Sequence, residues 1–198
     1  MSVADERRSL YRDRVLAAAE REFARVGFAE TKVAAIARAA DVSLATVYKT
    51  FPGKTEIWND LHAERMAALL ARVDERVAGI GSPLERLLAG IGAVAEFLTE
   101  HDAYLELSLH ASAGWLTASS GHGVQQTVWS SGLATIAAGV DAAREAGELA
   151  DLRPRVAAGL VVSALQVWLA DWVDAGRDRA PGVVVEDLVS HLRTMLTR

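Results

Sequence analysis

Residues 31–54 read TKVAAIARAADVSLATVYKTFPGK, and this stretch decides the fold. Apolar residues recur at helical spacing from 33 to 40, which predicts a short helix with one apolar face. Asp41 interrupts that pattern, and Ser43 can begin a second helix by accepting a hydrogen bond from an amide of its first turn, that of Ala45 or Thr46. The second helix then ends at the Pro-Gly pair. The stretch therefore predicts two short helices joined by a tight turn.

The second predicted helix has two unlike faces. Val47 and Phe51 are four residues apart and can face inward. A cation, a phenol and hydroxyls remain for the outer face, which suits a recognition helix in a DNA major groove. Many helical bundles contain a helix, a turn and a helix, so a packing role is the alternative. The outward residues are Leu44, Thr46, Tyr48, Lys49 and Thr50.

The order and spacing of this stretch closely resemble the DNA-binding signature of the TetR (tetracycline repressor) family of transcriptional regulators. The resemblance covers about residues 10–58, and the chain length agrees with that family. The positions that carry it are Thr31, Ile36-Ala37, Ala40, Val42-Ser43, Tyr48, Phe51 and Lys54.

Two positions depart from the family's pattern. Asp41 stands where Gly is most common, and we expect the turn to survive because Asp tolerates a left-handed conformation. Leu44 stands where a polar residue is common, and it can meet a thymine methyl. Lys54 matches the family's phosphate-contacting lysine, and it begins a helix. The candidate DNA-binding residues are Thr31, Lys32, Ser43, Leu44, Thr46, Tyr48, Lys49 and Lys54.

Composition favours an all-α, folded, soluble protein. The 198 residues are 51% hydrophobic and include only four prolines, and strand-like alternation is rare. Cysteine is absent, which excludes disulfides and thiolate metal sites and fits a cytoplasmic location. The first residues are charged where a signal peptide needs an apolar core. The uncharged segment 156–170 is shorter than the ~20 residues of a spanning helix, so no membrane is expected.

The net charge of −5 is unevenly distributed along the chain. Residues 1–55 hold ten basic and seven acidic residues, whereas residues 56–198 hold eleven basic and nineteen acidic ones. The basic part is therefore the part that carries the predicted recognition helix, as a DNA-binding protein requires.

The apolar spacing predicts an N-terminal three-helix helix-turn-helix domain (1–53) and a C-terminal helical bundle (54–198). The family resemblance implies that the bundle serves ligand binding and dimerisation. The first helix is expected over 9–26, with Gly27 ending it. A long linker helix is expected over about 54–78, rigid enough to transmit tilt. The further helices are expected at 83–100, 102–113, 123–147, 154–175 and 183–197, with a loop between 113 and 123.

The segment 156–173 is apolar nearly all round, so it must be covered on every side. In a small domain one of its stripes can pack inward and leave the other for a second subunit, with a companion stripe from 185–196. A four-helix homodimer interface follows, and the family resemblance implies the same. The candidate interface residues are Val161, Leu165, Leu169, Leu188, Leu192 and Met195.

The second domain carries more aromatic surface than a small bundle usually needs. A packed core is one interpretation; the walls of an apolar pocket with a few orienting polar groups are the other. The candidate ligand-binding residues are Phe97, Tyr104, Leu107, His110, Trp115, Gln126, Trp129, Gln166 and Trp168.

No enzyme is expected. The five histidines are scattered without metal-ligand spacing, and the glycine patterns of nucleotide sites and hydrolases are absent, so neither a metal nor a cofactor is predicted. The leading hypothesis is a dimeric repressor that occupies operator DNA until a small apolar or aromatic ligand binds. The alternatives are a small-molecule-binding or catalytic helical bundle without DNA readout, and an architectural DNA-binding protein without sequence preference.

Overall fold

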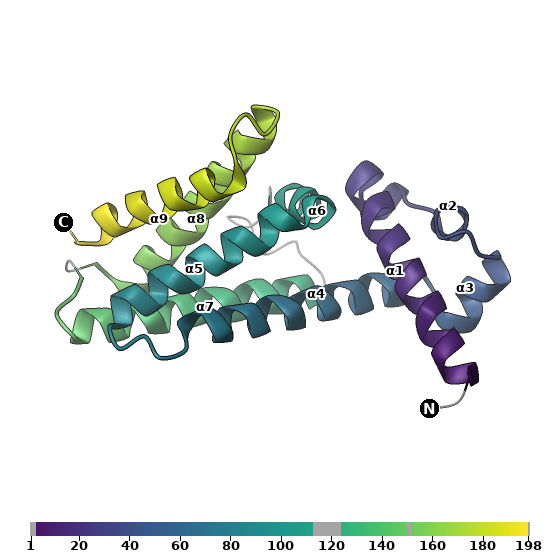
Figure 1. Ribbon diagram of the computed structural model, residues 1–198, viewed down its shortest axis with the longest axis horizontal. Helices are drawn as coiled ribbons and strands as arrows, with labels where there is room; N and C mark the ends of the chain where they lie inside the picture. Colours follow the sequence, from purple (N-terminus) through teal and green to yellow (C-terminus); the bar gives the residue numbers. More distant parts are fainter. Residues whose placement is uncertain (1–2, 113–123, 150–151, 198) are drawn as a thin grey trace. The chain divides into compact units, whose positions relative to one another are not determined.

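The computed structural model describes residues 3–112, 124–149 and 152–197, and every regular element in these ranges is an α-helix (Figure 1). The all-α prediction is confirmed. Each predicted helix is found, and the largest difference is that the first helix starts near residue 3 instead of residue 9. The helices are α1 (Val3–Glu30), α2 (Val33–Ala39), α3 (Leu44–Thr50), α4 (Lys54–Val77), α5 (Pro83–Glu100), α6 (Asp102–Ser112), α7 (Val124–Glu145), α8 (Pro154–Asp174) and α9 (Pro181–Thr197).

The chain packs as two compact units. The first comprises Met1–Ala67 with Asp102–Ala111, and the second comprises Ala68–His101 with Ser112–Arg198. The division falls inside α4, whereas the sequence places a boundary at its start. The first half of α4 belongs with α1 because aromatic and ionic contacts join the two helices.

The first unit contains the predicted three-helix arrangement, in which α2 and α3 pack on α1 and on each other (Figure 1). Its core includes four large apolar residues, among them Val47 and Phe51, which the sequence predicted to face inward. Gly27 has the φ of +79° and ψ of 163° that interrupt α1, as its position predicted. The buried core residues are Phe23, Ile36, Val47 and Phe51.

A row of aromatic rings joins α1, α4 and α6 within this unit. The Trp58 ring meets the Phe23 ring edge-on, with centroids 5.0 Å apart, and the His62 ring at 4.4 Å. His62 Nδ1 lies 3.2 Å from the hydroxyl of buried Tyr104 on α6. Burial lowers the pKa of His62 to about 4 and raises the pKa of Tyr104 to about 12.

An ion pair lies beside this row. Arg65 of α4 donates to both carboxylate oxygens of buried Glu20 on α1, at 2.8 and 2.6 Å. Such a pair is costly to break, because removing the arginine would leave the carboxylate buried without a partner. It therefore holds the first half of α4 to α1.

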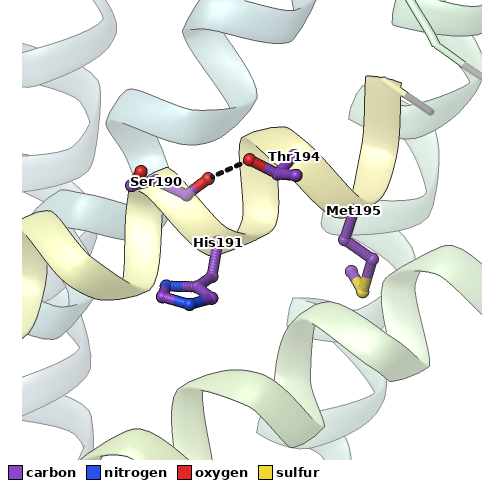
Figure 2. Close-up of a pocket in the computed structure, with 4 residues that line it drawn as sticks. All are labelled: Ser190, His191, Thr194 and Met195. Atoms are coloured by element: carbon purple, nitrogen blue, oxygen red, sulfur yellow. Dashed lines mark hydrogen bonds between the residues drawn. The ribbon is translucent and has the colours of Figure 1, made fainter.

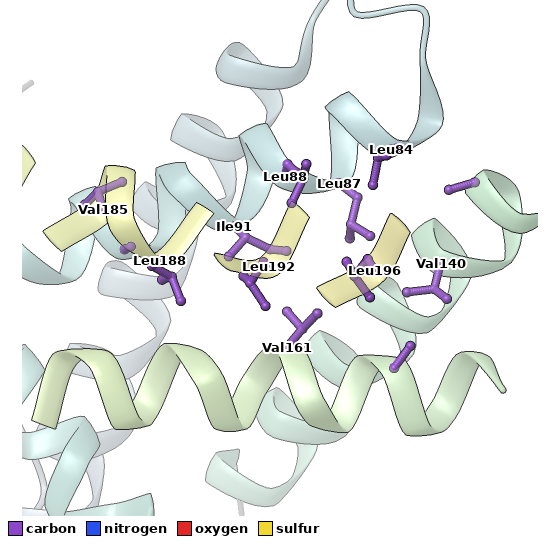
Figure 3. Packing of buried hydrophobic residues seen from close by; sticks show 13 residues of the cluster. Leu84, Leu87, Leu88, Ile91, Val140, Val161, Val185, Leu188, Leu192 and Leu196 are labelled. Atoms are coloured by element: carbon purple, nitrogen blue, oxygen red, sulfur yellow. The ribbon is translucent and has the colours of Figure 1, made fainter. Parts of the chain in front are cut away.

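In the second unit, α5, α7, α8 and α9 enclose one apolar core (Figure 3). Leu192 of α9 lies beside Ile91 of α5, and Val161 of α8 faces them. The second half of α4 is joined to α5 by two paired contacts, Arg72 with Glu100 and Arg76 with Glu96.

Helix α8 is the one helix in the described ranges that is long and apolar enough to cross a membrane by length and composition alone. Its side chains Ala157, Val161, Leu169 and Trp172 are buried inside the second unit. A helix in the core of a bundle meets the same length and composition test, so α8 does not indicate a membrane protein.

The depressed pKa of His62 predicts an acid-sensitive stability. The folded protein keeps the imidazole neutral down to about pH 4, whereas the unfolded chain takes up a proton near its ordinary pKa of 6.5. The stability that this creates is complete above pH 6.5 and falls as the pH drops from 6.5 toward 4. We expect the wild type to lose about 2 kcal/mol more than a His62→Gln variant between pH 7 and pH 5.

Urea unfolding at several pH values measures this difference. All other groups are the same in both proteins, so their contributions cancel in the comparison. A difference between wild type and variant that does not change with pH would mean that His62 titrates as an exposed histidine does.

Candidate nucleic-acid interface

Helix α3 is short, and its position depends on the turn before it. Asp41 has φ +54°, the left-handed conformation that its position predicted. The Val42 amide donates to the Ala37 carbonyl at 3.0 Å, and the Asp41 amide donates to the Arg38 carbonyl at 3.1 Å. These two bonds form a Schellman motif, which ends α2 and turns the chain.

Ser43 begins α3 as predicted. Its hydroxyl accepts a hydrogen bond from the Thr46 amide at 3.0 Å, and it lies 2.8 Å from the Thr46 hydroxyl. Val47 is fully buried against the rest of the unit. The cap and this buried anchor fix both the start and the rotation of the helix.

The outer face of α3 is open to solvent. Leu44 is 43% exposed and Tyr48 is 52% exposed, and Lys49 is exposed as well. An exposed leucine and tyrosine beside a lysine offer an apolar contact, a hydroxyl and a cation on one turn of helix. These are the groups that read base edges and phosphates in a major groove.

The other predicted DNA-binding residues lie before α2 and after α3. Lys32 is exposed just before α2. Thr31 is buried, and its hydroxyl lies 2.7 Å from the Gly27 carbonyl, to which it donates. Lys54 donates to three backbone carbonyls at the end of α1. Thr31 and Lys54 are therefore engaged within the unit.

Several arginines near this face are paired with carboxylates. Arg12 donates to Glu64 at 2.9 Å and to Asp60 at 3.2 Å, and the Glu64 hydrogen bond is the largest cause that raises its pKa. Arg14 donates to Asp41 at 3.3 Å. The exposed lysines Lys32 and Lys49 are therefore the better candidates for contacts with phosphates or bases.

The predicted ligand-binding residues are divided between the two units. Tyr104 and Leu107 are buried in the first unit. Phe97 is buried in the second, where its ring stacks on His101 with centroids 4.2 Å apart. The side chains of the other four aromatic or polar candidates before α8 lie outside the described residues: His110, Trp115, Gln126 and Trp129.

Two partly buried candidates lie on α8. Gln166 has a buried amide nitrogen without a hydrogen-bond partner among the described residues. The ring of Trp168 lies 5.0 Å from that of His191 on α9. A buried amide of this kind needs a polar partner, and it is the described feature of the second unit that best fits a ligand contact.

The described surface has two open hollows of about 320 and 330 Å³. The first lies on α9, where the Thr194 hydroxyl donates to the Ser190 carbonyl (Figure 2). Its lining is Ser190, His191, Thr194 and Met195. The second lies in the first unit and is lined by Asp5, Arg8, Ser9, Arg12, Thr50, Phe51 and Asp60. Neither hollow contains a residue predicted to bind the ligand.

Most of the predicted dimer-interface residues lie inside the subunit. Four of the six are buried in the core of their own subunit, at 0 or 1% exposed, so they have little surface to offer a partner. Leu165 and Met195 are partly buried. The four buried residues are Val161, Leu169, Leu188 and Leu192.

A different apolar surface is exposed on the same two helices. Val156, Leu160 and Val167 share one side of α8, and Val167 is 61% exposed. Val183 of α9 is also exposed. The sequence showed both stripes of α8, but it could not tell which one packs inward. His62 is one of five scattered histidines in the sequence, and its contacts are not evident from that pattern. Its spacing of four from Trp58 is the signal that the two residues share a helix face.

Comparison with known proteins supports the same interpretation. Residues 15–61 match the family described as "Bacterial regulatory proteins, tetR family". No curated protein matches the chain in sequence.

Solved structures share the fold at low sequence identity. The fatty acid degradation regulator FadR from Bacillus halodurans is 17% identical, with a TM-score of 0.76 over 92% of this chain and 94% of that one. FadR from Bacillus subtilis, in complex with stearoyl-CoA, is 18% identical, with a TM-score of 0.74 over 91% and 97%. The ketosteroid regulator KstR2 of Mycobacterium tuberculosis is 21% identical, with a TM-score of 0.73 over 94% and 95%.

The matched residues include the whole of α2, α3 and the turn between them. The shared fold extends the likeness over both units. Residues 15–61 thus match the tetR family of bacterial regulatory proteins, and the chain has a TetR-like fold, with a helix-turn-helix in its first unit and a helical bundle in its second.

Proposed function

We propose that the protein is a dimeric, sequence-specific DNA-binding repressor of the cytoplasm, released from its operator by a small apolar ligand. The observation that carries this proposal is the outer face of α3, where Leu44, Tyr48 and Lys49 are exposed on a helix whose cap and anchor are fixed. A helix held in this way presents its side chains to a groove at a defined angle.

In this proposal Lys49 and Leu44 read base edges, and Tyr48 gives a hydrogen bond to a base or a phosphate. The hydroxyl groups of Ser43 and Thr46 contact each other at the start of α3, and they can donate hydrogen bonds to the DNA backbone. Lys32 supplies a cation for a phosphate. Direct contacts to bases give sequence preference, whereas contacts to phosphates give affinity and orientation.

The dimer would use the exposed stripe of α8 rather than the buried one. Val156, Leu160 and Val167 leave apolar area in water in the single subunit, and a second copy of the same stripe would remove it. Two recognition helices could then read half-sites one helical turn, ~34 to 36 Å, apart.

The ligand would bind in the second unit. Solved relatives of the same fold include FadR in complex with stearoyl-CoA and a ketosteroid regulator, so an acyl or polycyclic compound is the class to test. The unpartnered amide of Gln166 and the half-buried ring of Trp168 could orient such a compound.

The DNA readout predicts different effects for two exposed lysines. Lys49→Ala should relax the preference at particular base pairs, at a cost of ~1 to 3 kcal/mol for a true base contact. Lys32→Ala should weaken binding to all duplexes similarly, and it should lower the slope of log affinity against log salt concentration by about one. Selection of sites from random duplexes, followed by titration at several salt concentrations, measures both effects. Unchanged specificity in Lys49→Ala and in Leu44→Ala would rule out α3 as the recognition helix.

The dimer is tested at Val167. Because this side chain is exposed in the subunit, Val167→Glu should leave the fold intact and weaken dimerisation about 100-fold or more through a charge in a dry interface. The control is Leu70→Glu, at an exposed leucine of α4. Sedimentation at micromolar protein concentration measures the oligomeric state. A Val167→Glu protein that stays dimeric, like the control, would place the interface elsewhere.

Ligand release is a coupling between two sites. A compound that prefers the conformation unable to bind DNA must weaken operator affinity, typically by about 5- to 150-fold, and the operator must weaken its binding by the same factor. Quenching of tryptophan fluorescence by acyl and polycyclic compounds, with Trp168→Phe and Gln166→Ala as site variants, measures binding. Compounds that bind tightly in the second unit without altering operator affinity would exclude the switch.

A further inference from the structure

Lys54 is the first residue of α4, and backbone carbonyls surround its ammonium group. The Nζ atom donates to the carbonyl oxygens of Phe28 at 2.6 Å, Ala29 at 2.9 Å and Thr31 at 3.0 Å. The Phe28 ring lies against the same group, with its centroid 4.5 Å from Nζ. An ammonium has three N–H donors, so these three acceptors use all of them.

These carbonyls are available because the helical chain ends at Glu30. Thr31 and Lys32 are not helical, so the last carbonyls lack the amide partners that a continuing helix would give and need other donors. The negative end of the α1 dipole lies here and favours a cation. The start of α4, by contrast, disfavours one. The carbonyls of 28–31, and not its own helix, therefore explain where the Lys54 ammonium lies.

The same turn is held from its other side. The buried Thr31 hydroxyl lies within hydrogen-bond distance of two α1 carbonyls, those of Gly27 at 2.7 Å and Glu22 at 3.2 Å. The Thr31 amide donates to Gly27 as well, at 3.3 Å. Helix α2 begins two residues later. A displacement of this turn would therefore displace the start of the helix-turn-helix.

We propose that Lys54 is a positioning residue, which clamps the turn 28–31 to the first turn of α4 and neutralises no DNA phosphate. The clamp fixes where α2 begins relative to α4, and through α2 it fixes the orientation of α3. This inference rests on the proposed DNA-binding function and reassigns one of the contacts that the sequence predicts. Lys54 could bind a phosphate only if its ammonium group first broke the hydrogen bonds that it makes with these carbonyls.

Arginine separates the two roles. Its planar guanidinium binds a phosphate at least as well as an ammonium does, so a phosphate contact would tolerate Lys54→Arg. The three carbonyls converge on one nitrogen, and the flat fork of arginine cannot direct its donors at them in that way. Lys54→Met removes the donors and keeps a similar apolar stem. Lys49→Met serves as the matched control, because that lysine is exposed on α3.

The first measurement needs no DNA. Both Lys54→Met and Lys54→Arg should lower the melting temperature of the full chain by about 4 °C or more, because each loses hydrogen bonds to a charged group. Lys49→Met should stay within about 1 °C of the wild type, as exposed substitutions do.

The second measurement uses an operator selected by the wild type, at a temperature where each variant is folded by circular dichroism. Lys54→Met should keep the salt slope of the wild type, while its preference for operator over random duplex falls about tenfold or more. Lys32→Met, at the exposed lysine proposed to contact a phosphate, should instead lower the slope by about 0.9. A loss of global stability alone would leave the preference of the folded variant unchanged.

Three results would overturn the proposal: a slope lowered by about 0.9 in Lys54→Met, wild-type stability in Lys54→Arg, or an unchanged operator preference in folded Lys54→Met. Failure of the proposed function looks different, because the wild type would then show no preference among duplexes. The melting temperatures would still test the clamp itself.

Discussion

The packing of α4 against α1 is the constraint on which the first unit depends. Trp58 meets Phe23 edge-on, and about two turns further along α4 Arg65 holds the buried Glu20 carboxylate. The apolar contact supplies stabilisation, and the ion pair fixes register, because a buried carboxylate without its arginine would be costly. The helix-turn-helix then packs on α1. Helix α3 thus has a fixed relation to the first half of α4, because both helices pack on α1.

Much of this unit could be predicted from sequence because its signals are local. The cap at Ser43 and the anchors Val47 and Phe51 each depend on a spacing within one turn, and all three have the predicted role. Asp41 was expected to keep the turn, and its φ of +54° allows the hydrogen bonds that end α2. Helix boundaries followed equally well where Pro, Gly or Ser marks them, as before α5.

The features that the sequence could not predict have a common physical origin. A sequence pattern shows which residues are apolar or charged, but it does not show which distant residues they contact. Both stripes of α8 are apolar, and only the approach of α5, α7 and α9 decides that Val161 and Leu169 face inward while Leu160 and Val167 do not. Lys54 illustrates the same limit. Its acceptors lie 23 to 26 residues away in the chain, where α1 ends and the chain turns toward α2.

Helix α4 has residues in both units, and arginine–carboxylate pairs hold each half. Arg65 and Glu20 are largely buried, whereas Arg72 and Arg76 pair with Glu100 and Glu96 near the surface. A surface pair contributes about 0 to 1 kcal/mol, but a buried one costs several times more to break. The buried pair with Glu20 therefore contributes more to holding α4 in place than either pair with α5 does.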